Sequence, residues 1–544
     1  MTPIDDRKGR IMMTSRRSLL KSGGGLGLAW VLAGNPLKAM AASGIPQNEF
    51  KAPEPFSFDI LDQEAQRLAR YSYEPPITPS PNVLAEIDYD QSQRIRYRTD
   101  RTVDLDGAGH YPVQFFHMNK YASDPVRISL VEGGEARELI YNQDLFEIPT
   151  GHPAEGLRAG AGFAGFRIMA EDRKTDWFAA MGASYFRSSG PYNQYGLSAR
   201  GIAIDTAMSK REEFPRFTHY WLEASPEPDG PVVIYALLDG PSIAGAYRMA
   251  TKRVTQPNGS YRCDMEIEAR LHIRADIDRI GIAPFSSMFW YGEDSHIEPR
   301  DWRPEIHDSD GLAILTGNGE RIWRPIINPP HAMTNAFSDR DPKGFGLLQR
   351  DRDFVHYLDD GIFYERRPSV WVEPLDAWGE GAVHLVELHT DTETWDNIVA
   401  CWVPKEKCKA GQRRVFRYRL SWLDDIPFPA TLGRTIGTWS GIGGPPGLSF
   451  NARPAATRKF VIDFAGDVFE GLGRDSGVEL IVNCSRGSIS GIATYPVVGQ
   501  RHRWRAMFDL KEQGAEPIDL RAYLRKGDTA LTETWLYQHF PASA

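Results

Sequence analysis

The sequence predicts a mainly β protein with two domains. Residues 263–275 alternate strictly between apolar and polar side chains, a period of two that is typical of a strand buried on one face. Glycine, proline, asparagine and aspartate separate further short apolar runs at turn-like intervals. At 544 residues, the chain is also longer than one hydrophobic core normally serves.

The expected elements follow in chain order. An amphipathic helix is expected at 58–71, where the apolar positions have helical spacing. Strands are expected at 94–97, 127–131, 232–238, 263–275, 382–388, 414–421, 478–485 and 530–539. Because no repeat of fixed period is present, we expect neither a propeller nor a solenoid.

The first 41 residues have the parts of an export signal. The segment 15–21 reads SRRSLLK, and a glycine-diluted apolar stretch at 22–37 follows it. Small residues at 39 and 41 suit a signal peptidase, so we expect a twin-arginine signal that is cleaved after Ala41. The apolar stretch is too short for a comfortable membrane span, which needs about 20 apolar residues. This interpretation places the mature protein in the periplasm, and a retained amphipathic anchor is the alternative.

Charge narrows the possible partners. Removing residues 1–41 takes away seven basic and two acidic groups, so the formal net charge moves from −9 to −14. An acidic surface repels nucleic acid, which usually selects a basic patch. No later stretch is long and apolar enough to span a bilayer, so we expect no membrane insertion of the mature chain.

The four cysteines suggest neither a zinc site nor a dithiol redox motif. Cys263, Cys401, Cys408 and Cys484 lie far apart in the sequence and form no CxxC pair. Only Cys401 and Cys408 are close enough for a short-loop disulfide in an oxidising compartment. The alternative is that Cys401, which lies in an apolar run, is a buried free thiol.

A domain boundary is expected after the strand at 414–421. The segment 424–429 reads DDIPFP and leads into the glycine-rich segment 441–447. The sequence therefore predicts a large domain at 42–425, a linker at 426–445 and a second β domain at 446–544, a normal size for a β-sandwich.

Four polar and aromatic clusters stand out from the strand pattern, at 301–311, 317–325, 364–371 and 389–397. Carboxylates beside Trp, Tyr and Arg suit a groove that stacks on sugar faces and positions two acids. Any one cluster taken alone is better explained by loop and ion-pair chemistry, and it is their succession within one stretch of chain that favours function.

Other chemistries are less well supported. Ser198 lacks the GxSxG spacing of a nucleophile elbow, so we interpret it as structural. His307 with Asp308 and Asp310 offers metal-ligand atoms, but no HxxEH or HxH pattern accompanies them. The sequence therefore predicts no metal and no cofactor.

Several long motifs are similar to those of one known family. They include GFAGF at 162–166, MGASYFR at 181–187, YGLSARGIAIDTA at 195–207, EFPRF at 213–217, GFGLLQR at 344–350, and the clusters at 303–311 and 317–325. Over essentially the whole mature chain, the sequence resembles the periplasmic glucan biosynthesis proteins G and D of Gram-negative bacteria. The twin-arginine leader favours the D branch of this family.

This resemblance implies a large N-terminal β-sandwich of the galactose mutarotase-like type and a C-terminal immunoglobulin-like β-sandwich. It also implies action on β-1,2-glucan, the backbone of osmoregulated periplasmic glucans. We therefore expect an inverting β-1,2-glucan glycoside hydrolase or transglycosylase. The alternatives are a non-catalytic glucan-binding scaffold that assists backbone synthesis or branching, and a lectin-like module for another polysaccharide.

The resemblance also implies which groups react. The family's general acid matches Asp396, and its general base matches Asp308. An inverting enzyme needs one carboxylic acid for the departing oxygen and one carboxylate for the incoming hydroxyl on the opposite face. The local pattern departs from the family at Asp310, Trp395 and Cys401. Without the resemblance, Asp396 reads as a strand-end aspartate that caps backbone amides.

Proximity to the matching motifs gives six candidates for substrate contact: Trp323, Tyr364 and Trp371 for stacking, and Arg324, Arg367 and Glu387 for sugar hydroxyls. The alternative for each is a place in the core or in a structural ion pair. The expected partner is β-1,2-glucan. A homodimer and contacts with other glucan-synthesis components are left open by the sequence.

Overall fold

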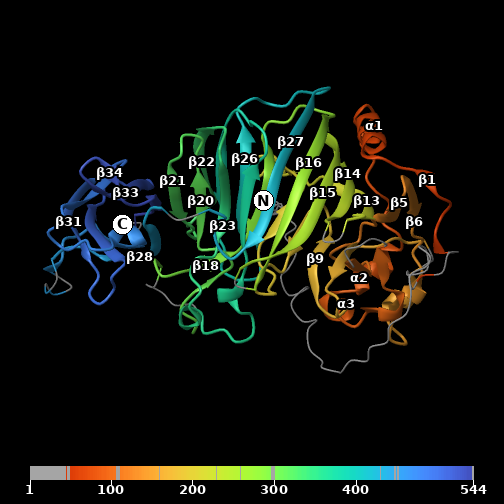
Figure 1. Ribbon diagram of the computed structural model, residues 1–544, viewed down its shortest axis with the longest axis horizontal. Helices are drawn as coiled ribbons and strands as arrows, with labels where there is room; N and C mark the ends of the chain where they lie inside the picture. The colour runs from red at the N-terminus through yellow and green to blue at the C-terminus, as the bar shows by residue number, and fades with distance from the viewer. Residues whose placement is uncertain are drawn as a thin grey trace, which may run out of the picture.

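The computed structural model describes residues 45, 49–105, 111–157, 160–227, 230–257, 259–295, 301–428, 431–445, 447, 449 and 452–541. The predicted signal at 1–41 lies outside these residues. Within them the protein is mainly β, as predicted, with two large sheets and smaller ones (Figure 1). None of the helices in these ranges is both long enough and apolar enough to cross a bilayer.

Helices are few and lie toward the N-terminal end of the described chain. The predicted helix at 58–71 is confirmed as α1 (Phe58–Ala69), and the hydroxyl of Ser57 caps its start by accepting from Ile60 N at 3.2 Å. Its buried residues Leu61 and Ala65 pack with apolar side chains of strands β14 and β15, described below. Two short helices follow, α2 (Pro81–Glu86) and α3 (Tyr89–Ser92).

The first large sheet runs through most of the molecule. Its strand order is β1 (Glu54–Pro55), β6 (Glu135–Glu138), β5 (Arg127–Glu132), β13 (Arg216–Ala224), β14 (Val232–Asp239), β15 (Ile243–Thr255), β16 (Tyr261–Ile273), β27 (Arg413–Leu423), β24 (Ser369–Pro374), β23 (Gly344–Leu348), β20 (Gly311–Leu315), β21 (Arg321–Pro325), β35 (Thr534–His539), β33 (Ile518–Lys526) and β30 (Val478–Cys484), with β34 (Thr529–Ala530) beside β33. The long strands β14, β15, β16 and β27 lie side by side in Figure 1.

The strand predicted at 263–275 is confirmed as β16 (Tyr261–Ile273). Cys263, Met265 and Ile267 are buried, as are the later apolar members of the same face. Asp264 and Glu266 on the other face are half-buried or exposed. β16 pairs antiparallel with β15 on one side and with β27 on the other, so the alternation in the sequence records one face in the core and one toward solvent.

The second large sheet packs against the first. Its order is β22 (Met333–Arg340), β25 (Glu380–Glu387), β26 (Ile398–Pro404), β17 (Ile280–Ser287), β11 (Ser198–Arg200), β10 (Tyr185–Ser188), β9 (Asp176–Met181), β8 (Gly165–Met169), β4 (Tyr111–Phe116) and β3 (Val103–Leu105), with β12 (Ala203–Ile204) beside β17. Phe285 on β17 stacks on Phe345 on β23, with ring centroids 5.7 Å apart. Phe166 on β8 meets Tyr220 on β13 at 5.1 Å. Such contacts give one core between two sheets, as a β-sandwich requires.

A second sandwich follows in the sequence and forms the blue lobe of Figure 1. Its own sheet has the order β28 (Arg434–Ile442), β29 (Thr457–Ala465), β32 (Arg503–Lys511) and β31 (Ser488–Pro496). This sheet packs on β33 and β35 around Phe460, Phe508 and Trp535. Since β35 pairs with β21 through Ile322 and Trp323, one sheet continues from the first sandwich into the second.

Strand β28 lies inside the segment predicted as a linker, 426–445. The glycines there suggest a flexible connection, but Gly437 has a packing role. A side chain at Gly437 would place its first carbon 2.3 Å from the ring of Trp439. The linker prediction is therefore corrected, because the second sandwich begins with Arg434. The strand predicted at 530–539 is likewise divided into β34 and β35.

Three other features complete the fold. The short pairs β2 (Arg96–Tyr97) with β7 (Phe146–Glu147) and β18 (Phe289–Tyr291) with β19 (Ile306–His307) stand apart from the large sheets.

All four cysteines are free, so Cys401 and Cys408 form no disulfide in this structure. Cys401 is buried on β26, in agreement with the alternative interpretation.

Candidate functional site

The two predicted reacting aspartates are tied to neighbouring residues of one segment. Asp308 directly follows β19, and its backbone N–H donates to the carbonyl of Met288 at 2.9 Å. Asp396 precedes β26, and the next residue, Asn397, accepts from Phe289 N at 2.9 Å. Met288 and Phe289 are adjacent, so the fold brings together the two segments that contain Asp308 and Asp396, although these are distant in the sequence.

Asp308 lies in the interior. It is 2% exposed, and one carboxylate oxygen lies 3.4 Å from Nε of Arg367, which is also 2% exposed. The guanidinium of Arg367 lies over the ring of Tyr364, 5.5 Å from its centroid. A buried carboxylate needs a positive partner, and Arg367 provides that charge.

Asp396 is half-buried and lines a small, partly open hollow. Its other lining residues include Tyr185, Arg200, Glu212 and Ser286. Arg200 and Glu212 form a buried ion pair, with Nη1 and Oε1 2.9 Å apart. Asp396 therefore faces open space and polar groups, as a residue that meets a substrate must.

Arg303 ties together three loops beside this region. Its guanidinium donates to Asp301 at 2.9 Å, Asp359 at 2.7 Å and Glu393 at 3.0 Å. Tyr364 also donates to Glu393, at 2.6 Å. Burial alone would lower the pKa of Arg303, but hydrogen bonds to these carboxylates raise it. The cluster predicted at 301–311 is thus linked to the cluster at 389–397 that contains Asp396.

Two tryptophans on these loops are open to solvent. Trp302 is 72% exposed and Trp395 is 43% exposed, and each is next to a residue of the region just described, Arg303 and Asp396. Large exposed aromatic rings in a polar surface are suited to stack on sugars. Sequence reasoning missed both as substrate contacts, although each stands among charged residues in a loop.

All six predicted substrate contacts are buried, and four of them belong to a core or to a buried ion pair. Trp323 and Trp371 are 4% and 2% exposed and belong to the core shared with the second sandwich. Arg324 pairs with Glu387 at 3.1 Å, and both are buried. The two rings are packed in a core and the two charges are paired, which is the alternative given above for each of the four, and their substrate contacts stay a prediction. Burial also raises the pKa of Glu387, partly offset by Arg324.

The other two candidates, Tyr364 and Arg367, are placed differently. Both are buried, but they contact Glu393 and Asp308, residues of the candidate site. Tyr364 and Arg367 therefore hold residues of the candidate site in place without being exposed themselves. The predicted structural residue Ser198 is fully buried on β11, opposite Ser286 on β17.

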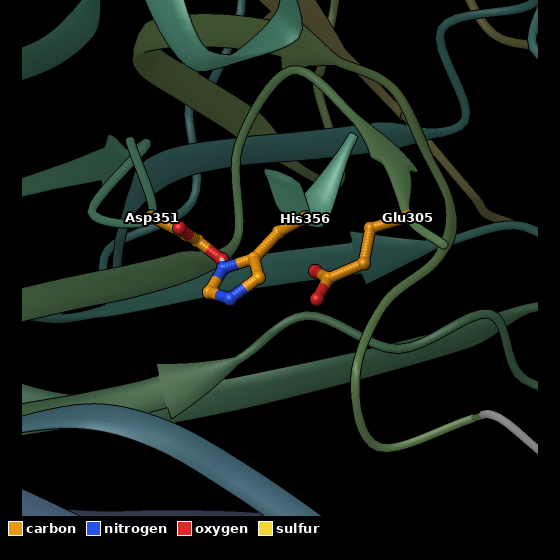
Figure 2. A group of neighbouring side chains, drawn as sticks. All are labelled: Glu305, Asp351 and His356. Carbon is orange, nitrogen blue, oxygen red and sulfur yellow. Dashed lines mark hydrogen bonds and ion pairs between the residues drawn. The ribbon is translucent and has the colours of Figure 1, made fainter. Parts of the chain in front are cut away.

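A group of possible metal ligands lies at Glu305, Asp351 and His356 (Figure 2). Their ligand atoms lie within 4.8 Å of one another, and carboxylate and imidazole groups are common ligands of divalent cations. Both Asp351 and Glu305 are already bonded: Asp351 to His356 at 2.6 Å, Glu305 to His307 at 3.0 Å. Hydrogen bonds to histidine rings therefore already engage both carboxylates.

His307 was considered with Asp308 and Asp310 as a metal ligand, and the structure gives it another role. Its Nδ1 lies 3.0 Å from Gln349 Oε1 and its Nε2 lies 3.0 Å from Glu305. Burial lowers the pKa of His307, but the hydrogen bond and the charge of Glu305 raise it. The net effect is a pKa above the usual value of histidine. With both ring nitrogens bonded, His307 has no lone pair directed at a metal.

Comparisons with known proteins agree with one another. Residues 56–539 match the family described as periplasmic glucan biosynthesis protein, MdoG. Glucans biosynthesis protein D 2 of Ralstonia nicotianae is 48% identical, over 97% of this chain and 98% of that protein. Glucans biosynthesis protein D of Xanthomonas oryzae pv. oryzae is 43% identical, over 98% of this chain and 99% of that protein. Among solved structures, the Slr1438 protein of Synechocystis has a TM-score of 0.16 at 7% identity, over 64% of this chain and 99% of that one, which is too low to support an argument.

Proposed function

The chain belongs to the periplasmic glucan biosynthesis (MdoG) family, and from this premise we propose that it acts on β-1,2-glucan as an inverting glycoside hydrolase or transglycosylase. The proposal places the mature protein in the periplasm after export by the twin-arginine pathway. The names of the family and of the relatives refer to glucan biosynthesis. The β-1,2 linkage of the substrate and the type of reaction are the proposed part.

One observation carries the enzymatic part of this proposal. Asp308 and Asp396 come from distant parts of the chain, yet both parts are bonded to one short segment. The backbone N–H of Asp308 donates to Met288, and the N–H of Phe289 donates to the side chain of Asn397, the neighbour of Asp396. Their surroundings differ, because Asp308 lies against Arg367 whereas Asp396 lines the hollow. Two carboxylates in unlike environments are what acid and base roles require.

The proposed reaction assigns one proton transfer to each aspartate. As the glycosidic C–O bond breaks, Asp396 gives its proton to the departing sugar oxygen. A water molecule forms the new bond to the anomeric carbon from the opposite face and passes its proton to Asp308. In a transglycosylase, a sugar hydroxyl takes the place of that water, and the proton balance is unchanged. Exposed Trp302 and Trp395 are proposed to stack on sugar rings at the opening.

Mass spectrometry of linear β-1,2-glucan after incubation with the mature chain tests the proposal. We expect shorter chains that have gained one water per cleavage from a hydrolase, and products without that water from a cyclising transglycosylase. Asp396→Asn is expected to lower the cleavage rate about 10²- to 10⁴-fold, the usual range for a general acid. Aspartate and asparagine have nearly the same shape, so glucan binding by the variant is the control for folding.

The competing function is a non-catalytic glucan-binding scaffold. It predicts that wild type leaves β-1,2-glucan intact and that Asp396→Asn binds glucan as tightly as wild type does. Intact glucan together with measurable binding would therefore replace the enzymatic proposal with the scaffold. Binding to other linkages in the same assay would instead point to a different polysaccharide.

A further inference from the structure

The wall of the hollow beside Asp396 is built from four neighbouring strands. Tyr185 on β10 is paired with Arg200 on β11, and β11 pairs with β17, which carries Ser286. Ser286 is in turn paired with Val399 on β26, the strand that Asp396 precedes. The side chains of Tyr185, Arg200, Ser286 and Asp396 all line the same hollow. The sheet register therefore fixes these groups relative to one another.

Arg200 is held rigidly in this wall. Its Nε donates to Ser286 at 3.1 Å and its Nη1 donates to Glu212 at 2.9 Å. Its guanidinium lies 5.3 Å from the ring centroid of Tyr185 and 5.7 Å from that of Phe214. Thr206 donates to the same Glu212 oxygen at 2.8 Å, so Glu212 is fixed as well.

A buried ion pair is weak evidence for stability, because well-packed apolar residues of similar volume often stabilise a core equally well. The Arg200 and Glu212 side chains are only 5% and 8% exposed, yet they border the hollow that contains Asp396. Stability alone is therefore a poor explanation for a rigid charged pair at this place. A better explanation is that the pair holds the ring of Tyr185, over which the Arg200 guanidinium lies.

The Tyr185 hydroxyl is suited to donate a hydrogen bond. Burial raises the pKa of Tyr185, which Arg200 lowers in part and the charges of Glu212 and Asp396 raise. A hydrogen bond with Ser286 lowers this pKa in part, but the net pKa stays above the usual value, so the hydroxyl keeps its proton at neutral pH. Tyr185 and Asp396 line the same hollow, which places the two residues in one site.

From this geometry we propose that Tyr185 is a positioning residue for Asp396. Its phenol O–H donates to one oxygen of the Asp396 carboxylic acid, which directs the protonated oxygen toward the glycosidic oxygen. Tyr185 keeps its own proton throughout, and the proton that reaches the leaving group comes from Asp396. The inference rests on the proposed function, since it requires Asp396 to be the general acid.

The test compares two substrates that differ in their need for an acid. One is linear β-1,2-glucan, and the other is a 2,4-dinitrophenyl glycoside of a β-1,2-gluco-oligosaccharide, whose leaving group departs without a proton. We expect Tyr185→Phe to lower kcat on glucan about 10- to 100-fold, as a misplaced acid does, with KM changed less than about twofold. On the dinitrophenyl glycoside, its activity should stay within about threefold of wild type.

A second variant and a matched control keep this test informative. Glu212→Gln retains an acceptor for Arg200 but removes the charge, so we expect about a 3- to 10-fold loss on glucan only. Tyr261→Phe makes the same chemical change on β16, in the other sheet, at a residue that is 41% exposed. It should match wild type on both substrates.

The outcomes separate this proposal from the proposed function. Equal losses on both substrates would show a structural role for Tyr185 and overturn the inference, as would no loss on either. Another outcome is that Asp396→Asn loses activity on glucan and keeps it on the dinitrophenyl glycoside, while Tyr185→Phe does not show this difference between the substrates. In that case only the inference about Tyr185 fails. If wild type cleaves neither substrate, the proposed function itself fails.

Discussion

The surroundings of Asp308 and Asp396 differ more than their similar positions in the fold suggest. Both residues flank strand ends, and Asp308 itself and Asn397, the neighbour of Asp396, are hydrogen-bonded to the segment at Met288 and Phe289. Asp308 is enclosed and lies beside the guanidinium of Arg367, whereas Asp396 borders a hollow with a rigid polar wall and exposed tryptophans nearby. The difference teaches that the fold holds one carboxylate beside a positive charge in the interior and leaves the other at a partly open surface, which the proposed function assigns to substrate contact.

The largest effect on stability is expected on the enclosed side. Arg367→Met removes the positive partner of Asp308 and leaves a carboxylate uncompensated in the interior. Breaking such a buried pair typically costs about 3–5 kcal/mol of the free energy of unfolding, measured by urea denaturation.

Arg417→Met is the matched control for that variant. Arg417 is 56% exposed in its side chain and lies 3.0 Å from Asp376. An exposed pair contributes about 1 kcal/mol or less, so the control should unfold nearly as wild type does. Equal effects of the two variants would remove the contrast between the enclosed and the open side.

The pH dependence of stability sharpens the same contrast. Burial raises the pKa of Asp310, two residues beyond Asp308, to about 6. In the unfolded chain an aspartate has a pKa of about 3.9. Because folding raises this pKa, the stabilising contribution of Asp310 is complete below pH ~4 and is lost as the pH rises through about 6.

Asp310→Asn should therefore be stabilised relative to wild type as the pH rises from ~4 to ~7, by roughly 2 kcal/mol. Thermal unfolding of both proteins across this range measures the difference. Asp467→Asn, at a side chain that is 97% exposed, is the control and should follow wild type at every pH. A constant difference between Asp310→Asn and wild type would contradict the expected titration.

The smallest effect is expected at the open side. Trp302→Ala removes an exposed ring, so we expect the Kd for β-1,2-glucan to rise about 3- to 10-fold, the usual contribution of one stacked ring. The free energy of unfolding should change by less than about 0.5 kcal/mol. Calorimetric titration on an Asp396→Asn background measures the affinity without cleavage.

Val498→Ala is the control for that affinity measurement, since Val498 is 97% exposed in the second sandwich. It should bind glucan as the background variant does. If Trp302→Ala also binds glucan as tightly as the background variant does, the exposed ring of Trp302 is not where sugars stack.

The parts of the fold that could be predicted from the sequence are those governed by local periodicity. β16 and α1 follow directly from alternation and helical spacing. The burial of Trp323 and Trp371 could not be predicted, because the second sandwich that covers them comes from residues much later in the chain. In the sequence, a tryptophan beside arginines has the same pattern whether it lies in a substrate groove or in a junction between domains.

The candidate site could be predicted only in part. The resemblance implies Asp308 and Asp396 as the reacting groups, and the clusters at 301–311 and 389–397 are linked in the structure by Arg303. The wall of Arg200, Glu212 and Tyr185 was missed, since Tyr185 and Arg200 lie in matching motifs, and Glu212 directly precedes one, and these segments carry no recognisable catalytic pattern. Their role depends on which strands become neighbours, and that pairing is set by contacts between distant segments.

The most direct test of the central claim is the anomeric configuration of the product at the moment of cleavage. Proton NMR of wild-type protein with β-1,2-glucan, followed from the first minutes, distinguishes α from β reducing ends before they interconvert. A single displacement by Asp308-activated water with Asp396 as acid predicts α ends first. If β ends appear first, a covalent intermediate is indicated and the assignment of Asp308 as a base is contradicted.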